Sequence, residues 1–100
     1  MAQKKNTKAK ALLWKTTDGK KSITSLQELL ETLIAIPEED IDKEISMNIN
    51  KEEHKLVAWL EENFSQQLNL IETVKSIQRE FTPQQIREMI IRDLRVIIKV

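Results

Sequence analysis

The sequence predicts a mostly α-helical domain in which an N-terminal β-hairpin precedes four or five short helices. Two observations support this expectation: an Asp-Gly pair near the N-terminus is typical of a hairpin turn, and the apolar residues after it recur at helical spacing. The chain has 100 residues, 40% apolar and 32% charged, as in one ordinary globular domain. Because the first ten residues hold four lysines and almost no large apolar side chain, we expect a flexible basic tail over 1–10 and one domain over 11–100.

The hairpin is predicted at Asp18-Gly19, where a type I′ turn needs positive φ at both central residues. A two-residue loop at this pair places Trp14 directly opposite Ile23. Both side chains then lie on one face of the hairpin, which we expect to point into the core.

The first two helices are predicted directly after the hairpin. In residues 25–36, Ser25 and Glu28 have the spacing of a capping box, and a stripe of apolar side chains extends to Ile34. A short second helix is expected after Pro37, with three acidic residues in its first turn that oppose the helix dipole.

Three longer helices complete the predicted fold. One is expected to start with the caps Asn50 and Glu53, and another to cover 68–81. The last begins at Thr82-Pro83, although the β-branched residues over 95–100 leave a C-terminal strand as the alternative. The predicted core consists of Trp14, Ile23, Leu29, Leu30, Leu33, Leu56, Trp59, Leu60, Phe64 and Val74.

Two stretches, DGKKSITSLQELLETL and NINKEEHKLVAWLEENF, resemble a family of small domains of unknown function common in archaea. That family shows a DG hairpin, an SLxELxxxL helix, and an H-V-N segment before a helix with F-x-x-W-I. The resemblance covers roughly residues 12–75. The matched residues are Leu26, Glu28, Leu29, Leu33, Ile49, Asn50, Leu56, Trp59 and Leu60. The chain departs from the family at Asn48 and Lys55, where the family tends to have His and Asp, so the resemblance implies a fold and no activity.

The residues give little support for catalysis. No cysteine is present, which excludes disulfides and thiol nucleophiles, and a single glycine argues against a phosphate-binding loop. The one histidine, His54, has no partner at metal-ligand spacing, and we interpret it as an exposed surface residue. We therefore predict that the protein is not an enzyme and has no metal site, no cofactor and no small-molecule substrate.

The apolar runs are too short for a signal peptide or a membrane span, so we expect a cytoplasmic protein without membrane partners. The leading functional hypothesis is a protein-interaction or structural module of unknown pathway, with a homodimer as one form. The last predicted helix carries more apolar positions than one stripe requires. The predicted interface consists of Met89, Ile90, Ile91, Leu94, Ile97 and Ile98.

The alternative hypothesis is a nucleic-acid-binding accessory protein that uses the N-terminal lysine tail. Residues 1–21 contain seven lysines and one acid, and each lysine that meets a phosphate releases counterions and adds affinity. Trp14 could stack on a base, although its predicted place opposite Ile23 is a core position. The predicted contacts are Lys4, Lys5, Lys8, Lys10, Lys20 and Lys21.

Overall fold

The computed structural model describes residues 10–17, 19–48, 54–78 and 80–98. In this part of the chain a two-stranded antiparallel hairpin precedes five α-helices and one short 3-10 helix, which confirms the predicted fold class. The elements are β1 (Leu12–Thr16), β2 (Gly19–Ile23), α1 (Leu26–Ala35), α2 (Glu38–Glu44), the 3-10 helix η1 (Ser46–Asn48), α3 (Lys55–Asn63), α4 (Leu68–Lys75) and α5 (Pro83–Ile98).

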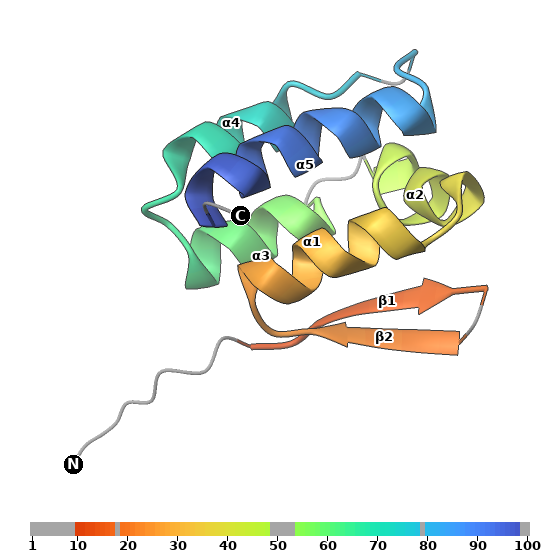
Figure 1. Cartoon of the computed structure of the whole chain (residues 1–100), viewed down its shortest axis with the longest axis horizontal. Coiled ribbons are helices and arrows are strands. Elements are labelled where there is room, and N and C mark those ends of the chain that lie inside the picture. Colours follow the sequence, from red (N-terminus) through yellow and green to blue (C-terminus); the bar gives the residue numbers. More distant parts are fainter. Residues whose placement is uncertain (1–9, 18, 49–53, 79, 99–100) are drawn as a thin grey trace.

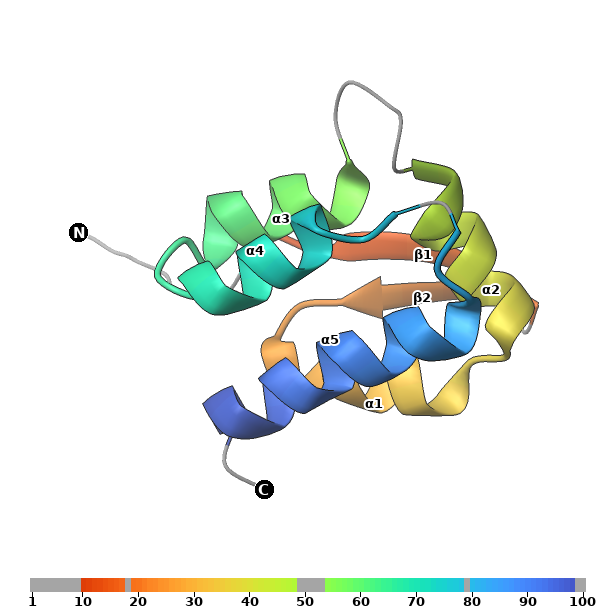
Figure 2. The same ribbon diagram turned by 90° about the horizontal axis from the view of Figure 1, so that it is seen from above.

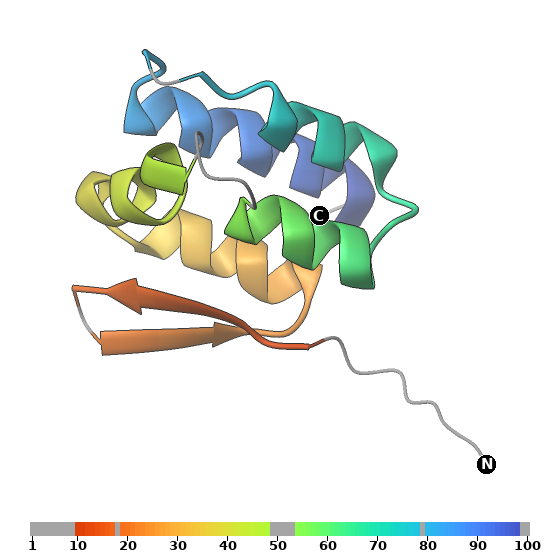
Figure 3. The same cartoon turned by 180° about the vertical axis from the view of Figure 1, so that it is seen from behind.

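These elements are stacked in three layers (Figure 1). The hairpin forms one outer layer, α1, α2 and α3 lie in the middle, and α4 and α5 form the opposite layer, as the reverse view also shows (Figure 3). Helix α5 packs against α1, α2 and α4 (Figure 2). The hairpin and α5 therefore lie on opposite sides of the middle layer.

The register of the hairpin differs from the predicted one by two residues. Leu12, rather than Trp14, pairs with Ile23, and residues 17 and 18 separate the last paired residues. Gly19 follows this loop with a φ of 123°, a conformation that favours glycine. Because a shift of two residues leaves each side chain on the same face, Trp14 and Ile23 are both fully buried as expected.

A carboxylate on α2 holds the loop of the hairpin. The backbone N–H and the hydroxyl of Thr17 donate to Oδ2 of Asp40 at 3.0 and 3.3 Å. Asp40 is fully buried, whereas the sequence suggested only a dipole-opposing role for the acids of this helix. It therefore fastens the hairpin to the middle layer.

The predicted caps at Ser25 and at Thr82 are confirmed. Ser25 accepts from the N–H of Glu28 at 3.0 Å, and Thr82 and Gln85 exchange the two bonds of a capping box at 3.1 and 2.8 Å. The Glu28 carboxylate accepts from the N–H and hydroxyl of Thr24, and these hydrogen bonds lower the pKa of Glu28. These two helices thus begin where local hydrogen bonding predicts.

Other helix boundaries differ from the predictions. Helix α3 begins at Lys55, and the expected caps over 50–53 lie outside the described residues. Helix α4 ends before Ser76, whose N–H and hydroxyl bind the carbonyl of Thr73, rather than extending to 81. Helix α5 continues to Ile98 because packing overrides β-propensity, so the strand alternative is wrong for 95–98; residues 99–100 lie outside the described part.

The predicted core residues are buried, except that Phe64 is only partly buried, with its ring edge against Trp59. Within α4 the expected stripe was wrong at its start. Leu68 is 67% exposed, and Leu70 is fully buried instead. The helix begins at Leu68, and this first side chain is mostly in contact with solvent.

Because Leu70 is buried and Leu68 is exposed, substitution by alanine should affect stability very differently at these two positions of α4. Leu70→Ala leaves a cavity and should lower the free energy of unfolding by about 2–5 kcal/mol. Leu68→Ala, at an exposed position, should change it by no more than about 0.5 kcal/mol. Urea unfolding curves of both variants measure the difference, and equal losses would contradict this packing of α4.

Candidate functional site

Helix α5 has one fully buried row of side chains. Ile86, Ile90 and Leu94 are spaced four residues apart and point into the core between α1, α2 and α4. Ile90 and Leu94 were predicted as interface residues, and this part of the prediction is corrected because neither is accessible. The other predicted interface residues are partly buried and pack against the core; these are Met89, Ile91, Ile97 and Ile98.

The surface between α1 and α5 forms an open hollow of about 690 Å³, which we call the α1/α5 hollow. Two of its apolar side chains are strongly exposed, Ile34 at 51% and Val96 at 71%. The lining residues are Ile34, Gln84, Arg87, Glu88, Ile91, Arg92, Arg95 and Val96. Ile34 was predicted as part of an apolar stripe of its helix, and Val96 was not among the predicted interface residues.

A second hollow of about 420 Å³, the α4/α5 hollow, lies on the other side of Val96, which lines both hollows. Leu68 lines it too, so α5 is bordered by one exposed apolar side chain from α1, Ile34, and one from α4, Leu68. The lining residues are Gln66, Gln67, Leu68, Asn69, Leu70, Asp93, Val96 and Ile97. A third hollow, of about 360 Å³, shares two residues with the first and is lined by Phe81, Gln85, Glu88, Met89 and Arg92.

The three arginines of the α1/α5 hollow are not equivalent. The Arg87 guanidinium donates to the carbonyls of Ile34 and Ile36 at 3.3 and 2.8 Å. Because the last turn of α1 contains no basic residue, Arg87 supplies both hydrogen bonds and positive charge to that helix end. We therefore interpret Arg87 as a structural residue.

Arg92 and Arg95 instead present their charge to solvent. The Arg92 side chain is 74% exposed, with Nε 3.9 Å from a carboxylate oxygen of the adjacent Asp93. Arg95 is exposed and makes no ion pair within the described part of the chain. Asp93 accepts a hydrogen bond from the Thr73 hydroxyl of α4, and Glu88 accepts from Gln84 at 2.8 Å. The lining of the hollow thus combines aliphatic side chains with an excess of positive charge.

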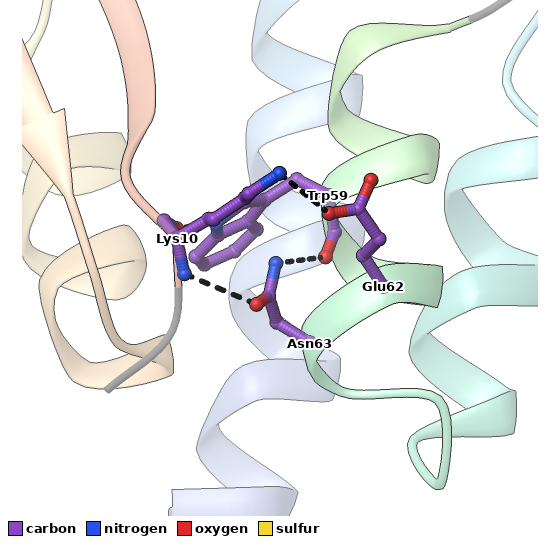
Figure 4. A network of polar contacts seen from close by, with 4 residues as sticks. All are labelled: Lys10, Trp59, Glu62 and Asn63. Atoms are coloured by element: carbon purple, nitrogen blue, oxygen red, sulfur yellow. Dashed lines mark hydrogen bonds and ion pairs between the residues drawn. The ribbon is translucent and has the colours of Figure 1, made fainter. Parts of the chain in front are cut away.

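Lys10, assigned to the mobile tail, is instead held against α3 (Figure 4). Its carbonyl accepts from the indole N–H of Trp59, and its own N–H donates to Oδ1 of Asn63 at 3.1 Å. The Asn63 amide donates to the Trp59 carbonyl at 2.9 Å, and the Lys10 ammonium lies 3.8 Å from Glu62. A buried indole N–H needs such an acceptor, so Lys10 belongs to the ordered domain.

The other lysines predicted to contact nucleic acid fall in two groups. Lys20 and Lys21 are exposed on β2, and Lys20 lies directly opposite exposed Lys15 of β1. Lys4, Lys5 and Lys8 lie outside the described residues. Trp14 is fully buried and therefore is not available to stack on a base.

His54 is not the exposed residue that the sequence suggested. It is half-buried at the N-cap of α3, and burial lowers its pKa, partly opposed by the backbone of Ile45. It lies outside the hollows beside α5. The imidazole ring of His54 is therefore a partly buried side chain of the domain at the start of α3.

The lowered pKa predicts a specific pH dependence of stability. In the unfolded chain the pKa of His54 is about 6.5, so the unfolded chain binds a proton more readily than the folded chain. The contribution of neutral His54 to stability is therefore complete above that pH and is lost as the pH falls toward the folded-state pKa. His54→Gln should reduce the loss between about pH 7.5 and pH 5.5. Chemical unfolding at both pH values measures it, and an unchanged pH dependence would contradict the assignment.

No family model matches the chain, and neither a curated protein nor a solved structure is significantly similar to it. The resemblance to the archaeal domains therefore stays a prediction. Among the described residues, no group of three or more His, Cys, Asp or Glu side chains is placed to hold a metal ion. In the same residues, no helix has the length and apolar character needed to span a membrane.

Proposed function

We propose that this chain is a non-enzymatic interaction module that binds a partner protein through the exposed side chains along α5. The observation that carries the proposal is the grouping of Ile34, Val96 and Leu68 around one helix. Large apolar side chains in contact with water are unfavourable, and a group of them beside polar residues is typical of a protein-binding surface.

A protein partner fits this surface better than a small substrate. Small-molecule sites are concave and direct several polar groups at one point. Here the hollows lie open along a helix, and the polar side chains of Arg87, Gln84 and Glu88 are already engaged with neighbours. The lining of the α1/α5 hollow contains no Ser, Thr, Cys or His that could act as a nucleophile or a base.

Site-specific photo-crosslinking in the cells that make the protein tests this proposal. A benzophenone side chain at position 96 should form a discrete adduct with another protein, identified by mass spectrometry and reproduced with the two purified proteins. The same group at Ser22, exposed on the hairpin in the opposite layer, is the control. No adduct at position 96, or the same adducts at both positions, would overturn the proposal.

A second candidate, a nucleic-acid-binding accessory protein, is favoured by the pairing of Lys15 with Lys20. Like charges directly opposite each other destabilise a hairpin, and Lys21 adds a third exposed positive charge. An anionic strand along the hairpin would relieve this repulsion and release counterions.

This candidate predicts salt-dependent binding of a fluorescent oligonucleotide, single- or double-stranded, measured by anisotropy. The double variant K15E/K20E exchanges one like-charged pair for another and should abolish binding, whereas Val96→Asp should have no effect. Binding that ignores salt, or that persists in the double variant, would contradict the hairpin as a nucleic-acid surface.

A further inference from the structure

We propose that the α1/α5 hollow receives an acidic amphipathic helix of a different protein, with apolar side chains against Ile34, Ile91 and Val96 and carboxylates facing Arg92 and Arg95. This inference rests on the proposed function and names the chemistry of the partner. Charge, geometry and the exclusion of other occupants support it in turn.

Charge favours an acidic partner. The hollow is lined by three arginines and one glutamate, although the chain as a whole has no net charge. Arg87 is engaged with the end of α1. Glu88 accepts from Gln84 but keeps its negative charge, so positive charge still exceeds negative in the lining, and Arg92 and Arg95 are the exposed cations that can meet a partner. Guanidinium groups bind carboxylates through paired hydrogen bonds, and a partner that covers the aliphatic side chains beside them would lower the competition from water.

Geometry favours a helix over an extended segment. The lining residues of α5 run from Gln84 to Val96, which spans about 18 Å at the helical rise. Both walls are helices, whose backbone groups are already bonded, so an extended segment would find no strand edge to pair with. A helix satisfies its own backbone and can place apolar side chains at every third or fourth position along this length.

A second copy of the chain fits the hollow poorly. In a symmetric contact the same surface meets itself, so the four guanidinium groups of Arg92 and Arg95 from the two copies would share only two lining carboxylates, those of Glu88. The acidic first turn of α2 does not line the hollow, so its use would require a head-to-tail contact. Nucleic acid is also disfavoured as the occupant, because the residues that line the hollow include no aromatic side chain on which bases could stack.

The test uses two synthetic helical peptides with identical leucine positions, one with glutamates flanking the leucines and the other with lysines. Each is titrated into the isotopically labelled full-length chain and followed by amide NMR shifts. The glutamate peptide should shift signals at the end of α1 and along α5, and should bind about tenfold more tightly than the lysine peptide at low salt. Added salt should reduce the preference.

Two variants with the same change in charge locate the effect. Arg92→Glu with Arg95→Glu should reverse the preference, whereas Lys20→Glu with Lys21→Glu, in the opposite layer, should leave it intact. Because the four substituted side chains are exposed, both double variants should fold, and circular dichroism checks this.

Several outcomes would overturn the inference: no binding of either peptide, equal binding of both, a preference unchanged by the arginine variant, displacement by an oligonucleotide, or a dimer removed by Val96→Asp. A protein adduct at position 96 without binding of the glutamate peptide would leave the proposed function standing and overturn only the acidic helix.

Discussion

The burial of one row of α5 is the constraint on which the rest of the domain depends. Ile86, Ile90 and Leu94 are covered by three other helices, and this packing places α5 against α1 and α2 of the middle layer and against α4 of its own layer. Among the described residues, α1, α2 and α4 cover one face of this 16-residue helix. The apolar residues outside the buried row, Ile91 and Val96 among them, consequently remain partly or largely exposed, and the candidate site follows from this incomplete cover.

Polar contacts between distant segments hold the layers in register. Asp40 fastens the hairpin to α2 through Thr17, and Arg87 fastens α5 to the end of α1. The indole of Trp59 binds the chain at Lys10, just before β1. Each contact gives a side-chain partner to a backbone group in a turn, at a helix end or just before a strand. These side chains therefore determine how the elements meet, while the apolar core supplies most of the driving force.

Local patterns predicted the elements well because the interactions behind them are local. Capping pairs such as Ser25 with Glu28 span three residues, and both partners are visible in a short stretch of sequence. The hairpin register was wrong because Asp18-Gly19 is compatible with more than one loop. The apolar pattern does not separate registers two residues apart, since both keep Trp14 and Ile23 on the inner face. The apolar pattern thus determined which face of the hairpin is buried but not which residues of the two strands pair.

The candidate site was harder to predict, since apolar periodicity identifies rows on a helix without showing which row a neighbour covers. Ile34 and Ile90 look alike in sequence, yet Ile34 is half exposed and Ile90 fully buried. A count of charges in the sequence has the same weakness, because Arg87 and Arg95 each add one positive charge to the net charge whether or not another part of the fold binds them. Only the fold shows that Arg87 serves the end of α1 while Arg95 stays available. The character of the surface thus depends on contacts between residues about 50 positions apart, which no local pattern contains.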